Sequence, residues 1–182
     1  HSLFVALRDC NIFLENLVAV PGLEEEERLR WLDEVKVLKA FYHFWLMQMY
    51  GPIPIVRTNI PVGATASETN VYRASIDDIV GYLTELLDEV IEAENLPGLI
   101  NYVYTEKGRI TMPIAKALKA KILMLSASPI FNGNSDFNSL VDNQGNSLVN
   151  RTYDPQKWVL AKEAVLEAIE SAEANGHFLH QF

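Results

Sequence analysis

The chain has 182 residues, of which 49% are hydrophobic and 21% charged, and its formal net charge is −9. This composition is that of a folded globular protein long enough to bury a sizeable core, not that of a disordered chain. An acidic protein lacks the basic surface that non-specific binding to nucleic acid or to an anionic membrane requires, so neither is an expected partner.

The single cysteine, the first residues and the length of the apolar runs each bear on the kind of protein. Cys10 is the only cysteine, so no internal disulfide can form, and its apolar helical surroundings predict a small buried side chain. The chain begins directly in a helical pattern, which we interpret as a fragment or a processed product. No apolar run of about 18 residues is present, so no membrane-spanning helix is expected.

Hydrophobic residues at helical spacing predict two helices in the first third of the chain. The first covers about residues 3–17 and ends before Pro21-Gly22. The second is expected from about Glu24 to Tyr50, because acidic residues favour a helix N-terminus and Gly51 followed by prolines ends a helix.

The C-terminal part of this second helix is unusually apolar. From Phe41 to Tyr50 it carries hydrophobic residues on nearly all sides, which predicts burial between neighbouring helices. We therefore expect Trp45 and the other aromatic residues of this stretch to pack in the core. His43 has no cysteine or carboxylate at ligand spacing, which favours a hydrogen-bonded core or boundary histidine over a metal ligand.

Three further helices follow at lower aromatic content. Ser75, Thr111 and Asp154 are their candidate N-caps, and Asn175-Gly176 is the expected end of the last one. We expect these helices over residues 75–95, 111–126 and 154–175, and loops over residues 51–74, 96–109 and 132–152. Trp158 is expected to anchor the last helix in the core, and Trp31 to pack at its boundary.

Two of the helices share a short repeated sequence. Lys36–Ala40 reads KVLKA and Lys116–Ala120 reads KALKA, and each is followed by a break, at Gly51-Pro52 and at Ser128-Pro129. Repeated helical hairpins of this kind predict a solenoid-like stack.

Longer segments around these repeats resemble the SusD/RagB family of outer-membrane nutrient-binding lipoproteins. One similarity is to that family's aromatic-rich helix and the Tyr-Gly pair that ends it, in EVKVLKAFYHFWLMQMYGPIPIV at 34–56. GRITMPIAKALKAKILMLSASPIFNG at 108–133 is similar to its Gly-Arg-x-Thr start and Ser-Pro exit. The segments at 11–16, 72–92 and 158–170 stand in the same order as in that family.

The resemblance implies an all-α fold of tetratricopeptide-like helical hairpins in a right-handed superhelical stack. Residues 1–182 would then form one partial domain that lacks the family's N-terminal lipoprotein segment and its C-terminal half. Cys10 lies inside a helical pattern, so it does not match the lipidated cysteine of the family.

The resemblance also implies a function. It is that of a surface-facing outer-membrane lipoprotein that binds oligosaccharides and delivers them to a TonB-dependent, SusC-like transporter, without enzymatic activity or a cofactor. Much of the glycan site of such proteins lies in loops and in the second half, so part of it is expected outside this chain.

Two loop clusters combine aromatic rings with amides, which suit the CH faces and hydroxyls of sugars. The first comprises Asn101, Tyr102 and Tyr104, and the second comprises Asn132, Asn134 and Phe137. The alternative for each cluster is an ordinary polar loop with its aromatic residue turned inward.

Other chemistries find little support in the sequence. It contains no serine-nucleophile, zinc-protease or phosphate-loop motif, and acidic pairs such as Asp77-Asp78 are common on solvated helix faces. His177 and His180 have no third metal ligand nearby. Two alternatives to glycan binding remain, namely a tetratricopeptide-type protein-interaction scaffold without a sugar site and an all-helical glycoside hydrolase with two facing carboxylates.

Overall fold

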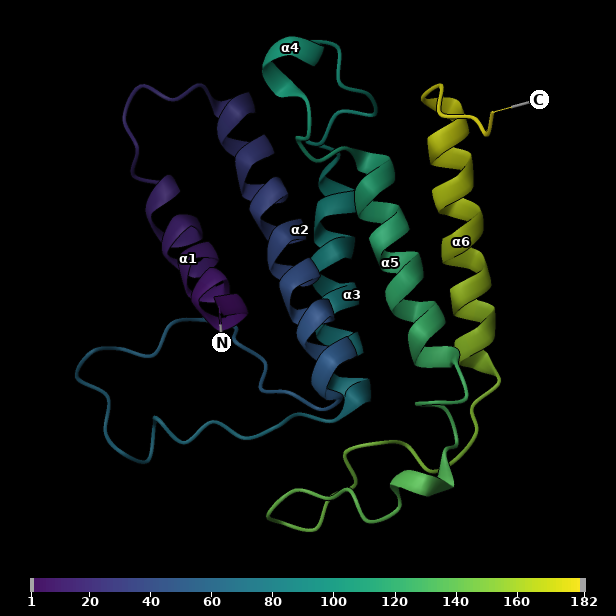
Figure 1. The fold of residues 1–182 in the computed structure, drawn as a ribbon. Helices are drawn as coiled ribbons and strands as arrows, with labels where there is room; N and C mark the ends of the chain where they lie inside the picture. The colour runs from purple at the N-terminus through teal and green to yellow at the C-terminus, as the bar shows by residue number, and fades with distance from the viewer. Residues whose placement is uncertain (1, 181–182) are drawn as a thin grey trace.

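The computed structural model describes residues 2–180, which form an antiparallel array of helices (Figure 1). The helices are α1 (Ser2–Leu17), α2 (Glu25–Tyr50), α3 (Ile76–Ala93), α4 (Val103–Glu106), α5 (Met112–Ala127) and α6 (Gln156–Ala174), with a 3-10 turn at Ser135–Phe137. Over these residues the chain forms no β-strand, only two isolated bridges. The predicted all-helical fold is confirmed, and the one-turn helix α4 is an addition within a segment that was expected to be a loop.

The long helices pack in the order in which the chain makes them. Helix α1 contacts α2, α2 contacts α3, α3 contacts α5, and α5 contacts α6. Each helix therefore has its sequence neighbours as its spatial neighbours, which is the arrangement of a helical stack (Figure 1).

Local signals set the helix ends close to where the sequence predicts them. The Ser75 hydroxyl accepts a hydrogen bond from the Asp78 N–H at 3.1 Å and so caps α3. Gly51 ends α2 with a φ of 69°, and its N–H donates to the Met47 carbonyl at 2.8 Å. Helix α6 begins slightly later than predicted, and the Asp154 carboxylate accepts a hydrogen bond from the Gln156 N–H at 2.9 Å.

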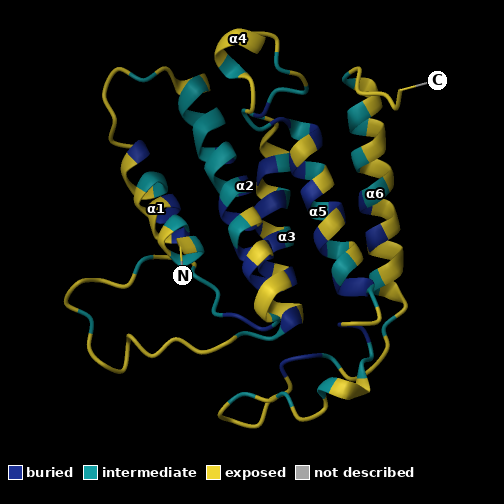
Figure 2. Cartoon of the chain, in the orientation of Figure 1, coloured by how far each residue is buried: buried dark blue, intermediate teal, exposed yellow. Residues whose placement is uncertain are grey.

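The hydrophobic core centres on α3, which has the clearest apolar stripe of the long helices. Ile79, Leu83, Leu87 and Val90 recur at helical spacing and are completely buried. Figure 2 shows that burial is concentrated on the sides of the helices that face one another. The packing of α3 against α2 and α5 therefore accounts for much of the core.

The expectation that all the aromatic residues of α2 are buried is wrong. Phe44 is 2% exposed, whereas Phe41 and Trp45 are 39% and 46% exposed. The rings of Phe41 and Trp45 pack edge to face, with their centroids 6.0 Å apart. Helix α2 packs mainly against α1 and α3, so its remaining side has no cover within the described residues. Trp158 is likewise 43% exposed rather than in the core, because α6 packs only against α5.

Two buried polar residues of α2 hold the chain that follows Gly51. The Lys39 ammonium donates to the Arg57 carbonyl at 2.6 Å, and the Val56 N–H donates to His43 Nε2 at 3.1 Å. Because Nε2 accepts, Nδ1 is the protonated nitrogen and donates to the Lys39 carbonyl at 2.8 Å. Burial lowers the pKa of His43 to about 4, so the ring is neutral at pH 7. The predicted hydrogen-bonded core histidine is confirmed.

Substitutions at Leu83 and Trp45 test how the core is distributed. We expect Leu83→Ala to lower the free energy of unfolding by about 2–5 kcal/mol, because it leaves a cavity at a fully buried site. Trp45→Ala, at a half-exposed site, should cost only about 1–2 kcal/mol. Urea unfolding followed by circular dichroism measures both values, and a larger loss for Trp45→Ala would contradict this placement of the core.

Acid should destabilise the protein through His43. The pKa of His43 is lower in the folded state than its ordinary value near 6.5, so the unfolded chain binds the proton first as the pH falls. We expect about 3 kcal/mol of stability to be lost between pH 6.5 and pH 4 from this group. Urea unfolding at several pH values should show a shallower decline for His43→Gln than for the unsubstituted protein. Equal declines would show that His43 does not drive the effect.

Candidate functional site

The two loop clusters predicted from the sequence lie at opposite ends of the helical stack. The segment that carries Tyr102 and Tyr104 is next to the N-terminal end of α2, whereas the loop with Asn132 and Phe137 is next to the N-terminal ends of α3 and α6 (Figure 1). The two clusters therefore do not combine into one binding site.

The first cluster is open to solvent. Asn101 is exposed, the Tyr102 side chain is 73% exposed, and Tyr104 is fully exposed. Their residues lie at the start of the one-turn helix α4, which the Thr105 and Glu106 N–H groups close by donating to the Tyr102 carbonyl. Both aromatic rings are available to a ligand.

Ion pairs hold this exposed segment against α2. The Glu106 carboxylate lies 2.7 Å from Arg30 Nη1 and 3.1 Å from Arg109 Nη1. Arg109 also forms a two-pronged pair with Glu34, with Nε and Nη2 at 2.9 and 3.1 Å from its two oxygens, and it contacts Glu27 at 3.0 Å. Because these side chains are largely buried and meet in good geometry, they fix the position of α4. The sequence did not predict this network, because residues 27–34 of α2 and residues 106–109 lie far apart along the chain.

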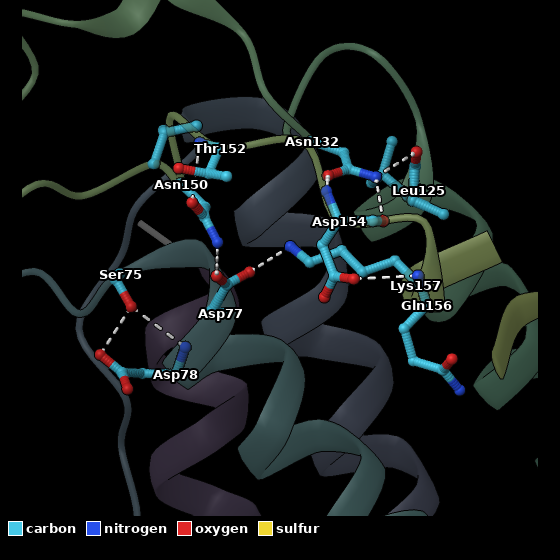
Figure 3. Close-up of polar contacts among 12 residues, drawn as sticks. Ser75, Asp77, Asp78, Leu125, Asn132, Asn150, Thr152, Asp154, Gln156 and Lys157 are labelled. Carbon is cyan, nitrogen blue, oxygen red and sulfur yellow. Dashed lines mark hydrogen bonds and ion pairs between the residues drawn. The ribbon is translucent and has the colours of Figure 1, made fainter. Parts of the chain in front are cut away.

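Asn132 of the second cluster is buried and bonded to backbone atoms. Its Nδ2 donates to the Asp154 carbonyl at 2.9 Å and to the Ala127 carbonyl at 3.3 Å, and its Oδ1 accepts from the Asp154 N–H at 2.8 Å (Figure 3). The side chain thus joins the end of α5 to the start of α6. Gly133 beside it has a φ of 75°, and a Cβ there would lie 2.9 Å from Tyr153 Cα, so glycine is required.

Asn134 and Phe137 also have local structural partners. The Asn134 side chain accepts from the Asp136 N–H at 2.9 Å and donates to the Ile130 carbonyl at 3.2 Å. Phe137 is partly buried against the hydrophobic core. This second cluster thus corresponds to the alternative of a polar loop with its aromatic residue turned inward.

Asp77 connects the same loop to two helix N-termini. Its carboxylate accepts from Asn150 Nδ2 at 3.2 Å and forms an ion pair with Lys157 of α6 (Figure 3). A further bond runs from the Ile76 N–H to the Leu148 carbonyl at 2.9 Å. Together with Asn132, these contacts hold the long loop between α5 and α6 in one conformation.

Several surface hollows lie between these elements. One of about 630 Å³ separates α1 from residues 56–62, and one of about 200 Å³ lies between α3, α5 and α6. Two more, of about 430 and 260 Å³, lie beside the loop between α5 and α6. The Tyr102–Tyr104 segment is a protruding surface that lines none of these four hollows.

Asp88 and Glu89, an acidic pair on α3, form ion pairs with neighbouring helices. Asp88 lies 2.6 Å from Lys119 of α5, and Glu89 lies 3.0 Å from Lys36 of α2. Within residues 2–180, no three His, Cys, Asp or Glu side chains gather in a way that could hold a metal ion. In the same range, no helix has the length and apolar character needed to cross a membrane.

Solved structures with a similar fold are known. No protein-family model matches the chain, and no curated protein is significantly similar to it in sequence. The solved protein BT4246 is 33% identical, with a TM-score of 0.87 over 96% of this chain and 30% of its own length. A SusD-like protein from Bacteroides fragilis is 26% identical, with a TM-score of 0.61 over 69% of this chain and 23% of its own length.

A third similar structure is a laminarin-binding SusD-like protein, which is 29% identical with a TM-score of 0.57 over 69% of this chain and 25% of its own length. The chain spans less than a third of each of these three proteins. The predicted resemblance to SusD-like proteins is confirmed at the level of the fold.

Substitution of Asn132 tests its structural role. We expect Asn132→Ala to lower the free energy of unfolding by about 2–4 kcal/mol, because it leaves buried backbone groups of Asp154 and Ala127 without partners. Asn138→Ala in the same loop, at an exposed position, is the matched control and should change stability little. Thermal and urea unfolding give both values. An Asn132→Ala protein of unchanged stability would leave this residue free for a binding role.

Proposed function

We propose that this chain, which has the helical fold of SusD-like proteins, is part of a non-catalytic surface protein that binds oligosaccharides for polysaccharide utilisation. In this proposal the protein is a lipoprotein of the outer membrane and passes its ligand to a TonB-dependent, SusC-like transporter. The helical stack would support the ligand-binding loops and dock against that transporter.

The similar structures support the class of ligand. One of them is described as a laminarin-binding SusD-like protein. This chain spans 25% of the length of that protein. Glycan binding by the whole protein that contains this chain is therefore our proposal.

The single observation that carries the proposal to particular residues is the exposure of Tyr102 and Tyr104 beside Asn101. Flat aromatic faces cover the CH surfaces of sugars, and an amide can both donate to and accept from hydroxyl groups. The ion pairs of Glu106 hold this segment in place, which lowers the entropy cost of binding. We propose these three residues as a glycan contact, whereas Asn132, Asn134 and Phe137 serve mainly to shape their loop.

A protein-interaction scaffold without a sugar site is the second candidate function. The exposed side of α2 favours it, because Phe41, Trp45 and Met49 form an apolar stripe of the kind found at protein interfaces. The exposed Tyr102 and Tyr104 favour glycan binding instead, because a protein-interaction scaffold does not require exposed aromatic rings on its loops. The two functions can coexist in one protein, as they use different surfaces.

A binding screen with paired variants tests the proposal. The chain is screened on a glycan array, and each ligand found is titrated by calorimetry into the unsubstituted protein and into Tyr102→Ala/Tyr104→Ala. Loss of two aromatic faces is worth about 1–3 kcal/mol, so affinity should fall roughly 5- to 150-fold with the melting temperature unchanged. Tyr153→Ala, an exposed tyrosine at the opposite end, is the control and should bind normally.

The outcomes separate the candidates. Unchanged affinity of the double variant would remove Tyr102 and Tyr104 from the proposal, and a large loss of stability would show that they pack rather than bind. A chain that binds no glycan would contradict a sugar site within residues 1–182. The same array applied to any longer protein that contains this chain would then show whether another region binds.

A further inference from the structure

Two hollows lie beside the loop between α5 and α6, and consecutive residues of that loop line them. The smaller, of about 260 Å³, is lined by Tyr72, Asp142, Asn143 and Gln144. The larger, of about 430 Å³, begins with the next residue of the loop, Gly145, and extends past Ser75, Asn150 and Arg151. The smaller hollow is thus lined by residues 72 and 142–144, and the larger by residues within 75–77 and 145–152, which follow them closely in the chain.

The smaller hollow combines an aromatic face with fixed polar groups. The Tyr72 side chain is 63% exposed. Asp142 Oδ1 accepts from the Gln144 and Asn146 N–H groups, both at 2.8 Å, and Oδ2 accepts from Asn146 Nδ2 at 2.9 Å. These hydrogen bonds, those of Asn146 above all, lower the pKa of Asp142, so it is ionised at neutral pH. A carboxylate has about four acceptor positions, and these hydrogen bonds use most of them.

The larger hollow continues this surface with hydroxyl, amide and guanidinium groups. Ser75, Ser147 and Thr152 contribute hydroxyls. Arg151 uses Nη2 to donate to the Asn138 carbonyl at 2.5 Å, which leaves donors on Nε and Nη1. A ligand along both hollows would thus meet an aromatic face first and then a row of donors and acceptors.

The charges along the two hollows nearly cancel. Asp77 is paired with Lys157, and the remaining carboxylate of Asp142 is balanced by the guanidinium of Arg151 (Figure 3 shows Asp77 and Lys157). An acidic saccharide needs an excess of cationic groups, which this surface does not offer. An uncharged ligand with many hydroxyl groups fits these groups better.

The walls of the hollows are held by buried contacts. Leu148 and Val149 are 2% and 1% exposed, and the Ile76 N–H donates to the Leu148 carbonyl at 2.9 Å. Asn150 is bonded to Asp77, so the loop is joined to α3 both at Leu148 and at Asn150. A surface arranged before the ligand arrives loses less entropy on binding.

We propose that these two hollows form one groove that binds a linear, uncharged oligosaccharide, with a sugar ring against Tyr72 and hydroxyls bonded to Asp142, Asn143 and Arg151. The groove lies at the opposite end of the stack from Tyr102 and Tyr104, so it is a second, separate contact for glycan. It rests on the proposed function, because it takes the same class of ligand.

The test uses the full chain and defined probes. Laminarihexaose, cellohexaose and maltohexaose are the uncharged probes, and a hexamer of galacturonic acid is the charged one. Calorimetry measures affinity, and amide chemical shifts locate each bound probe. We expect an uncharged probe to bind, to shift amides within residues 142–152, and to bind at least about fivefold more weakly to Tyr72→Ala and to Asn143→Ala. Tyr153→Ala, which lines neither hollow, is the control and should bind normally.

Each remaining outcome has a distinct meaning. Binding that shifts amides only near residues 101–106 and is unchanged in Tyr72→Ala overturns the groove and leaves the proposed function standing. Tighter binding of the galacturonic acid hexamer overturns the choice of an uncharged ligand. A chain that binds none of the four probes in either assay contradicts the groove, and silence on the wider glycan array contradicts a sugar site in this chain as well.

Discussion

The packing of α3 between α2 and α5 is the contact on which the remaining structure depends. Its stripe of Ile79, Leu83, Leu87 and Val90 is fully buried, and α1 and α6 are added to the outer sides of α2 and α5. Because each helix contacts mainly its neighbours in the chain, the connecting loops lie at the two ends of the stack (Figure 1). The candidate sites lie at those two ends for this reason.

The two ends are stabilised by different interactions. At one end, ion pairs hold the segment that carries Tyr102 and Tyr104. They join Arg30 and Glu34 of α2 to Glu106 of α4 and to Arg109, which lies between α4 and α5. At the other end, the buried amide of Asn132 holds a long loop by bonding to backbone atoms. In both cases polar contacts between residues far apart in sequence give the loops a defined shape, which a binding surface for flexible sugars requires.

The uncovered face of α2 departs from what its hydrophobic pattern predicts. A helix that is apolar on nearly all sides predicts burial on all sides, yet Phe41 and Trp45 remain about half exposed within these residues. The apolar side chains on this face exceed those that α1 and α3 cover. The similar solved structures are more than three times as long as the part matched here, which agrees with that excess of apolar surface.

The sequence by itself determined the number of long helices, their ends and the family of the fold. The number of helices and their ends follow from local chemistry, such as the serine cap at Ser75 and the glycine at Gly51, and from hydrophobic periodicity. The family follows instead from the resemblance of the segments at 34–56 and 108–133. The sequence also offered Asn101, Tyr102 and Tyr104 as one of two candidate loop clusters, but it left open whether the aromatic residues of either cluster face outward or inward.

Only the tertiary structure decided which polar residues are free and which are bonded. Asn132 looked like Asn101 in the sequence, but it is buried because the end of α5 and the start of α6 meet around it. Tyr72 and Asn143 lie 71 positions apart in the chain and line one hollow only because the loop folds against the N-terminus of α3. Contacts of that kind depend on how helices pack, which hydrophobic periodicity and capping residues do not specify.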